Sequence, residues 1–276
     1  MTTPAPSRST ARAGYLLAIA GTASLSAVSV ISKLVFRTLN RETFLPILYL
    51  GGFALTIVYM ALTGTLRSLR VPRRLWPWVL LVGALYSVGA FSYYWGIQVA
   101  SPSLASFFGR MQTVYTILWS VVWMRERLGR REVVGMALTL GGALIITYAG
   151  GSRVWQAFLI ALLGESLFNS LGFISSKIAL QRGVPPAALS GYRSLVMCLL
   201  IAAYTTLRGV WMPPPSGALW LTVAGAFFGP FLTWVLIMHA LSRADAAKVA
   251  LIRNLLPAFV VLYSAAVLGT LPTPRQ

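Results

Sequence analysis

The sequence predicts an all-α polytopic membrane protein, and two observations support that prediction. First, 57% of the 276 residues are hydrophobic and only 10% are charged, whereas soluble domains carry far more polar surface. Second, the apolar residues fall into long runs separated by short turns. A helical run of about 20 residues, at about 1.5 Å per residue, crosses the ~30 Å hydrocarbon core of a bilayer.

Nine helices are expected, and the first three are separated by basic turns. The first, 14–36, follows Arg8 and Arg12, and we interpret it as a membrane span rather than a signal peptide because a similar run recurs later with a matching end. Residues 1–13 are expected to form a disordered cytoplasmic segment. The second and third helices are predicted at 44–63 and 76–97, with Trp76 and Trp78 as an interfacial belt beside basic residues.

The stretch 103–150 predicts a membrane hairpin formed by the fourth and fifth helices, 103–124 and 132–149. Arg110 is the one charged residue in 104–124, and 133–150 has none. The turn between them, 125–132, holds four arginines in eight residues. Short loops rich in arginine stay in the cytoplasm. The remaining helices are expected at 154–180, 186–207, 217–240 and 244–268, and no gap is long enough for a soluble domain.

The distribution of Lys and Arg predicts a cytoplasmic N-terminus. Counted in alternate gaps, one side of the membrane has twelve basic residues and the other has five. The richer side should be cytoplasmic. Its residues are Arg8, Arg12, Arg67, Arg70, Arg73, Arg74, Arg125, Arg127, Arg130, Arg131, Arg182 and Arg243, against Arg37, Arg41, Arg153, Arg208 and Arg275.

Several function classes find no support in the sequence. The net charge of +18 lies in short turns, so it is explained by topology and not by a nucleic-acid partner. Cys198 is the one cysteine, which excludes an intrachain disulfide and a thiolate metal site. With one histidine, one aspartate and no phosphate-binding glycine loop, neither an enzyme nor an ATP-driven pump is expected. We expect no cofactor and no metal.

The chain also repeats itself. A shift of 144 residues places Ser26 on Ser170, Ser32 on Ser176 and Lys33 on Lys177, and a shift of 143 places Arg110 on Arg253. These pairs divide the chain into units at 14–150 and 151–276. A unit of five helices is odd, so its second copy must enter the membrane upside down. Inverted repeats of this kind build alternating-access transporters with a midplane site.

The chain resembles the ten-helix EamA-type branch of the drug/metabolite transporter (DMT) superfamily. The residues that carry the resemblance are Glu126, Leu128, Gly135, Leu138, Gly141, Gly142, Leu144 and Pro257. The resemblance implies an exporter of amino acids, metabolites or drugs, and aromatic amino-acid exporters of the YddG type are one candidate type. It also implies a tenth helix, but the chain reaches Gln276 where that helix should begin, and the matching glutamate is absent.

The missing tenth helix leaves two expectations open, a truncated chain or a nine-helix protein. In the family, the fifth and tenth helices pack at the periphery, so a central site could survive the loss. Gly135, Gly141 and Gly142 would let another helix approach closely. That helix could belong to this chain, which we favour, or to a second copy.

Ionisable residues inside apolar runs are the first candidates for a substrate site, because each costs roughly 2.5–3.5 kcal/mol to insert. Glu165 is the one acid well inside such a run, and Asn169 lies on the same helix face. Glu165 could bind a substrate ammonium or exchange protons, or it could form a buried ion pair with Arg193 or Arg110. Both interpretations stay open.

Arg110 and Arg253 occupy matching places in the two units. Arginine can bind a carboxylate through two parallel hydrogen bonds. Each residue could instead sit at a helix start near the interface and hold carbonyls or lipid phosphate there. His239 is expected to form a hydrogen bond at a helix terminus. The lysines Lys33, Lys177 and Lys248 lie nearer helix ends and are expected to extend to the interface, with a gate or a headgroup contact as the alternative.

Aromatic residues crowd the third and fourth helices. Tyr86, Tyr93 and Phe108 could line a cavity, where ring stacking or cation–π contact would suit an aromatic or cationic solute. Tyr115 and Trp119 are further candidates. Plain helix packing is the alternative for each of them.

The sequence therefore predicts a secondary active transporter that exports small metabolites such as amino acids by alternating access. The resemblance and the arginine- and alanine-rich composition point to a bacterial inner membrane. The expected partners are a small-molecule substrate and the lipid bilayer, with proton coupling and oligomeric state left open. The alternatives are a membrane-embedded enzyme or lipid-handling protein, and a non-transporting scaffold.

Overall fold

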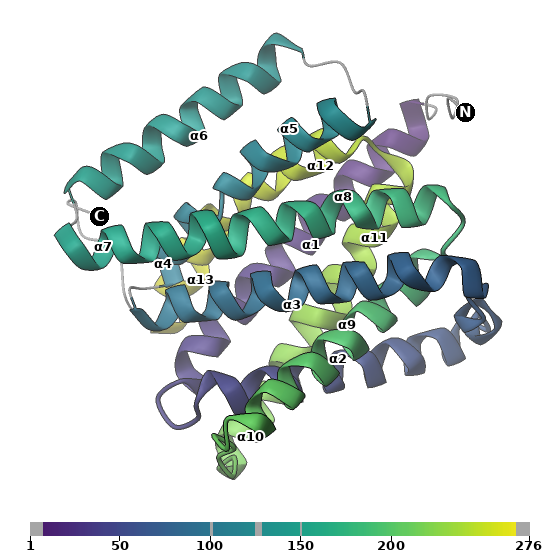
Figure 1. Cartoon of the computed structure of the whole chain (residues 1–276), viewed down its shortest axis with the longest axis horizontal. Helices are drawn as coiled ribbons and strands as arrows, with labels where there is room; N and C mark the ends of the chain where they lie inside the picture. The colour runs from purple at the N-terminus through teal and green to yellow at the C-terminus, as the bar shows by residue number, and fades with distance from the viewer. Residues whose placement is uncertain (1–7, 100–101, 125–128, 150, 269–276) are drawn as a thin grey trace.

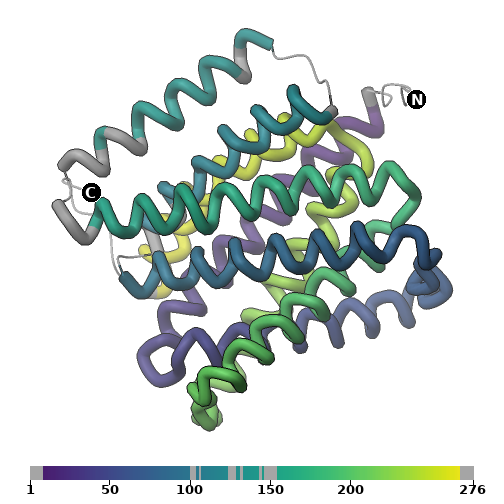
Figure 2. The backbone as a smooth tube through the Cα atoms, viewed as in Figure 1, coloured from purple at the N-terminus to yellow at the C-terminus, as the bar shows by residue number. Residues whose placement is uncertain are grey.

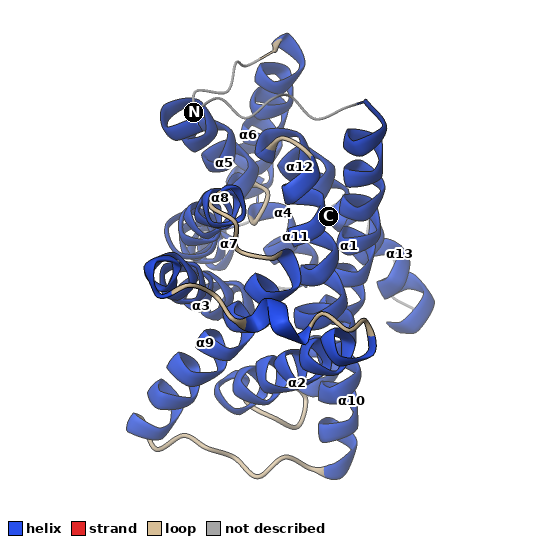
Figure 3. Cartoon of the chain, turned by 90° about the vertical axis from the view of Figure 1, so that its right-hand side faces the viewer, coloured by secondary structure: helices blue, strands red, loops and turns tan. Residues whose placement is uncertain are grey.

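The computed structural model describes residues 8–99, 102–124, 129–149 and 151–268, and every regular element in these ranges is a helix (Figures 1 and 3). The first half holds α1 (Arg8–Val35), α2 (Arg41–Leu62), α3 (Trp76–Val99), α4 (Pro102–Phe108), α5 (Met111–Met124) and α6 (Arg130–Ala149). The second half holds α7 (Gly151–Leu159), α8 (Leu167–Gln181), α9 (Pro186–Leu207), α10 (Ser216–Ala226), α11 (Trp234–Arg243), α12 (Ala246–Ile252) and α13 (Leu256–Leu268).

The all-α polytopic fold is confirmed, because helix covers each of the nine ranges expected from the sequence. In the described ranges, seven helical stretches are long and apolar enough to cross a membrane. They are Ser9–Val35, Arg41–Leu62, Arg73–Val99, Val154–Gln181, Pro186–Leu207, Ser216–Arg243 and Ala246–Val267. The fourth expected span is divided between α4 and α5, and the fifth is α6.

Four spans are interrupted, where the sequence predicted continuous helices. The fourth breaks at Gly109 and Arg110, and the ninth contains a 3₁₀ turn at Arg253–Leu255. The sixth and eighth contain π-helical turns at Ile160–Ser166 and Phe227–Thr233. Such turns disturb the regular i→i−4 hydrogen bonding and are frequent at functional sites.

The expected disorder of residues 1–13 is wrong in part, because α1 begins at Arg8. Residues 1–7 lie outside the described residues. So do the arginine-rich turn at 125–128, which includes Glu126 and Leu128, and the C-terminal segment 269–276.

Helices from the two halves of the chain interleave. α2 packs along α9, α3 packs along α8 and α9, and α1 packs along α11 and α13. Close approach requires small residues at some of these contacts. A Cβ atom on Gly83 of α3 would overlap Val196 of α9, and one on Gly52 of α2 would overlap Pro230. The two halves therefore share one helical bundle.

The serine-rich α1 supplies hydrogen bonds to the interrupted spans. The Ser24 hydroxyl donates to the carbonyl of Phe228 at 2.6 Å, and Ser26 donates to the carbonyl of Leu256 at 3.3 Å. Both carbonyls lie at or beside an interruption. Backbone groups that leave the helical pattern inside a membrane need such partners, because no bulk water reaches them.

Successive turns lie at alternate ends of the bundle, as the count of basic residues on the two sides of the membrane assumes. At one end, the Asn40 side chain donates to the carbonyl of Val210 at 2.8 Å. At the other end, the Tyr192 hydroxyl donates to the carbonyl of Leu69 at 2.7 Å. Turns 36–40 and 208–215 therefore share one end, and turn 63–75 lies at the other.

Two expectations about charged and polar helix ends have clear outcomes. Lys177 does not simply extend to the interface, because its ammonium donates to the carbonyls of Leu241 and Ala244 at 2.6 and 2.7 Å, at the end of α11. His239 forms a hydrogen bond, with Nδ1 2.8 Å from the carbonyl of Val235, but the expected helix terminus is wrong because α11 continues to Arg243.

α6 lies at one edge of the bundle (Figure 2), beside α5, α7 and α12. We favoured packing of another helix of this chain against its glycines. The described residues do not bear this out at Gly141 and Gly142, where a Cβ atom would meet no described atom within 4 Å. At Gly135 the nearest atom is Cδ2 of Leu251, at 3.3 Å. The glycine face of α6 is therefore mostly open in the described structure.

These glycines give a matched test of the packing. We expect Gly83→Ala to lower the free energy of unfolding by about 1–3 kcal/mol, because the new methyl group overpacks the contact with Val196. Gly142→Ala should be neutral or stabilising by up to about 1 kcal/mol, because the methyl group meets open space and alanine favours helix. Thermal unfolding in detergent measures both, and equal effects would contradict the packing described above.

Candidate functional site

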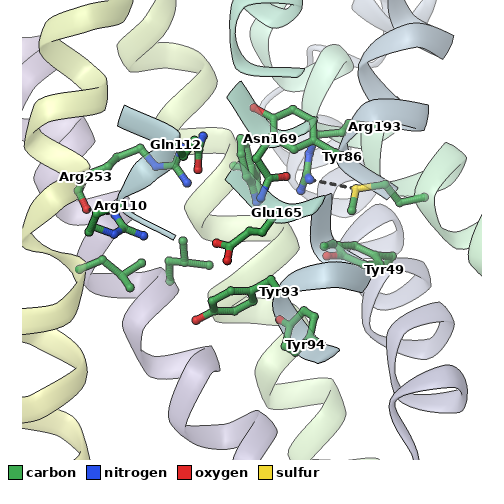
Figure 4. Close-up of a pocket in the computed structure, with 15 residues that line it drawn as sticks. Tyr49, Tyr86, Tyr93, Tyr94, Arg110, Gln112, Glu165, Asn169, Arg193 and Arg253 are labelled. Carbon is green, nitrogen blue, oxygen red and sulfur yellow. Dashed lines mark hydrogen bonds between the residues drawn. The ribbon is translucent and has the colours of Figure 1, made fainter. Parts of the chain in front are cut away.

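A cavity lies inside the bundle, where interrupted helices meet. Its volume is about 60 Å³. Its lining combines charged, aromatic and amide side chains from both halves of the chain (Figure 4). The lining residues are Leu25, Tyr49, Tyr86, Ala90, Tyr93, Tyr94, Arg110, Gln112, Glu165, Asn169, Arg193, Met197, Trp234, Arg253 and Leu256.

The break in the fourth span places Arg110 in this cavity. Around Gly109 the backbone uses tighter bonds to the third preceding residue, with Arg110 N to Phe107 O at 3.0 Å and Thr113 N to Arg110 O at 2.8 Å. Arg110 is 9% exposed. It therefore lies in the interior of the bundle, directly before the start of α5, and its depth in the membrane stays a prediction.

Side-chain hydrogen bonds join this break to the 3₁₀ turn of the ninth span. Nη1 of Arg110 donates to the backbone carbonyl of Arg253 at 2.5 Å. The Thr113 hydroxyl lies 2.6 Å from Oδ1 of Asn254 and 3.3 Å from the carbonyl of Ala250. The matching positions of the two predicted units thus contact each other directly. Figure 4 shows Arg110 and Arg253 together on one side of the site.

Glu165 lies in the π-helical turn Ile160–Ser166 and is 4% exposed. Its carboxylate lies against Gly109, where a Cβ atom would overlap it. The expected ion pair with Arg193 or Arg110 is not formed. In the described residues the ion pairs within 4 Å are Arg41 with Glu42 and Lys248 with Asp245, both outside the cavity. The charges of Arg110 and Arg253 act on Glu165 at longer range.

Arg193 on α9 is 1% exposed and is surrounded by aromatic rings. Its guanidinium carbon lies 3.9 Å from the ring centroid of Trp234, 4.9 Å from that of Tyr86 and 5.9 Å from that of Tyr49. Nη1 donates to the sulfur of Met197 at 2.9 Å, whereas Nε and Nη2 have no hydrogen-bond partner among the described residues. Cation–π contacts stabilise the charge, but they leave two of its donors unsatisfied.

Arg253 shares one of these rings. Its guanidinium carbon lies 5.4 Å from the ring centroid of Trp234 and 5.3 Å from that of Phe173. Trp234 follows the π-helical turn of the eighth span, which contains Pro230. The interruption of the eighth span thus positions the ring that two arginines contact.

The structure brings together seven of the nine side chains predicted from the sequence. Arg110, Glu165, Asn169, Arg193, Arg253, Tyr86 and Tyr93 all line the cavity. Their roles in binding stay predictions. The hydroxyl of Tyr93 lies 2.8 Å from that of Ser29, so α1 also fixes a cavity residue.

Tyr115 and Trp119 do not line the cavity. Trp119 stacks on Trp123 with ring centroids 5.0 Å apart, and its indole N–H donates to Ser170 at 3.2 Å. Phe108, also expected there, packs edge-on against Phe158 at 5.4 Å. Trp119 and Phe108 therefore serve helix packing, which is the alternative interpretation.

Sequence reasoning missed Tyr49, Gln112, Met197 and Trp234 as cavity residues. Two of them had a local signal, since Gln112 lies two residues after Arg110, and Met197 lies one helical turn after Arg193. Tyr49 had none, because α2 has no charged residue inside its apolar run. Trp234 could be placed only once the course of the eighth span was known.

One family model matches most of the chain. The model of the EamA-like transporter family matches the chain twice, at residues 12–148 and 156–276. An uncharacterized transporter of Haemophilus influenzae is 21% identical over 281 residues, which covers 91% of this chain and 83% of the relative. The uncharacterized transporter YojE of Bacillus subtilis is 23% identical over 189 residues, covering 67% of this chain and 60% of the relative.

Two further matches differ in how much they cover. A WAT1-related protein of Arabidopsis thaliana is 29% identical over 126 residues, which is 43% of this chain and 36% of the relative. A solved crystal structure superposes with a TM-score of 0.75 at 21% identity, covering 98% of this chain and 92% of that one. At that identity the likeness supports the shared fold.

Two threonines on α5 test the link between the interrupted spans. Thr113→Val should lower the free energy of unfolding by about 1–2 kcal/mol, because it removes the hydroxyl that contacts Asn254 and Ala250. Thr116→Val should be neutral or stabilising, because the buried Thr116 hydroxyl has no hydrogen-bond partner in the described part of the chain. Thermal unfolding in detergent compares the two, and an equal loss would contradict the link.

Proposed function

Because this chain belongs to the EamA-like transporter family, we propose that it is a secondary active transporter that exports small metabolites, amino acids among them. It is a membrane transporter by family. The substrate, the direction and the mechanism below are our proposal.

One observation carries the proposal: three arginines and one glutamate are buried around a single cavity. Charges are costly inside a bilayer and mark substrate or ion pathways there. Each of these side chains except Arg193 lies at an interruption of a span. Discontinuous helices around a midplane cavity are the usual binding site of secondary transporters.

The proposed mechanism is alternating access, in which the two inverted units open the cavity to one side and then to the other. A difference between matching lysines supports it. Lys177 binds the carbonyls of Leu241 and Ala244 at one end of the bundle. Its counterpart Lys33 lies exposed near the opposite end. The two units thus hold different arrangements at their ends, as a transporter open to one side requires.

In this mechanism Glu165 contacts the transported molecule or a proton that accompanies it. It lies between Arg193 on one side and the Arg110 and Arg253 pair on the other (Figure 4). A carboxylate without an ion pair at this place can receive a substrate ammonium. It can also take up a proton in one orientation of the carrier and release it in the other.

Counterflow in proteoliposomes tests the proposal. We expect labelled amino acids or related acids to exchange without ATP, and Glu165→Gln to lower the rate by about tenfold or more, because the amide carries no charge. The matched control is Asp245→Asn, which removes an exposed carboxylate that pairs with Lys248 and should leave the rate unchanged.

A proton gradient across the vesicle separates the two roles of Glu165. If the gradient accelerates the wild-type chain but not Glu165→Gln, the carboxylate takes part in coupling. If no solute moves although the protein is folded, transport by this chain is refuted and the scaffold alternative gains.

We also propose that the N-terminus is cytoplasmic and that the membrane is the inner membrane of a bacterium. Single cysteines at Thr65 and Met212, in a Cys198→Ala background, test the orientation, since both positions are exposed and their turns lie at opposite ends. A membrane-impermeant maleimide should label Met212→Cys in intact cells and Thr65→Cys after permeabilisation alone. The reverse pattern would overturn the orientation.

A further inference from the structure

The charges that line the cavity do not balance. Among the described lining residues, Arg110, Arg193 and Arg253 face one acid, Glu165. The tyrosines that complete the lining are uncharged at neutral pH. The cavity therefore carries an excess of positive charge, which favours an anion over a neutral zwitterion and disfavours a cation.

The hydrogen bonding of Arg193 indicates which anion fits. Nη1 is occupied by Met197, and the two nitrogens without a partner, Nε and Nη2, lie on one edge of the guanidinium. That edge presents two parallel N–H groups, which match the two oxygens of a carboxylate. The rings of Trp234, Tyr86 and Tyr49 hold the guanidinium plane. A buried charge with unsatisfied donors is costly, so an anionic ligand that accepts hydrogen bonds from this edge gains a large binding free energy.

A second positive group lies within reach of the first. The guanidinium carbons of Arg193 and Arg253 are both close to the ring centroid of Trp234, at 3.9 and 5.4 Å, so their separation cannot exceed the sum of these distances. Arg110 adjoins Arg253 through its hydrogen bond to the Arg253 carbonyl. One small molecule can therefore interact with Arg193 at one end and with this pair at the other (Figure 4).

Resting on the transport function proposed above, we propose that the cavity binds a small organic anion with two carboxylate groups. One carboxylate binds the Nε and Nη2 edge of Arg193, and the other lies beside Arg253 and Arg110. Glu165 lies between these two positions, where it receives the ammonium group of an acidic amino acid. Simple dicarboxylates and acidic amino acids thus form one substrate class, and amino acids with a single carboxylate leave one positive group unmatched.

The Nε and Nη2 atoms touch no solvent in this arrangement, so binding requires the side chains around them to move. Met197 allows this, because thioether sulfur is a weak acceptor and its unbranched side chain adopts several rotamers. The aromatic rings remain in place as the support of the guanidinium plane.

Binding to the full-length protein in detergent tests the proposal. Succinate, L-glutamate, L-phenylalanine and putrescine are titrated by calorimetry, and the melting temperature is measured with each. We expect the two dicarboxylates to bind and to raise the melting temperature, because a ligand that binds only the folded state stabilises it. L-phenylalanine and putrescine should bind about tenfold more weakly or not at all.

Substitutions then test whether Arg193 binds one carboxylate of the ligand. Arg193→Lys keeps the charge and loses the paired donors, so it should weaken succinate binding by about tenfold or more. Arg208→Gln removes an arginine at the exposed end of the same helix and should change nothing. The melting temperature of each ligand-free variant shows whether it folds.

The outcomes separate this inference from the transport proposal. If L-phenylalanine or putrescine binds as tightly as succinate, or if none of the four compounds binds, the dicarboxylate assignment is overturned. Counterflow of other solutes would then leave transport intact. If succinate binds equally well to Arg193→Lys, Arg193 is not the anchor. Dicarboxylate binding without any counterflow would instead refute transport.

Discussion

The hydrogen bond from Arg110 to the backbone carbonyl of Arg253 is the contact on which the interior of this protein depends. It joins the fourth and ninth spans, two of the four described spans that lose their regular helical bonding. Hydrocarbon offers no replacement for those lost bonds, so each interruption must be satisfied by the protein itself. The serines of α1 do the same for carbonyls of the eighth and ninth spans. These side-chain hydrogen bonds stabilise the interrupted helices that surround the cavity.

The arrangement combines rigid aromatic support with unsatisfied charge. Trp234 contacts both Arg193 and Arg253, so one ring stabilises two cations that repel each other. Glu165 offsets part of that repulsion from the π-helical turn without forming a close ion pair. A tight ion pair between Glu165 and an arginine would satisfy both charged groups and leave little binding free energy for a ligand. An open arrangement of charges keeps that binding free energy available for a solute.

The spans and most of the site could be predicted from the sequence, because apolar runs and the charges within them are local features. The interruptions could not. Glycine at 109 is compatible with a continuous membrane helix, and nothing beside Glu165 signals a π-helical turn. Tyr49 and Trp234 reach the cavity only through the packing of distant helices, which no single-sequence pattern reports. The expectation that Trp119 lines the cavity is wrong for the same reason, since the Trp119 side chain of α5 lies against α8.

Lys177, near the end of α8, affects how fast α8 can separate from α11 as well as how the two helices pack. Any motion that separates α8 from the end of α11 must break both bonds from Lys177 to the carbonyls of Leu241 and Ala244. A hydrogen bond to a charged group contributes about 1.5–3 kcal/mol, and each 1.36 kcal/mol of barrier slows a step about tenfold. Losing two such bonds at once delays opening by about a hundredfold or more. In the alternating-access mechanism proposed above, these bonds would give the cycle a dwell time at this end.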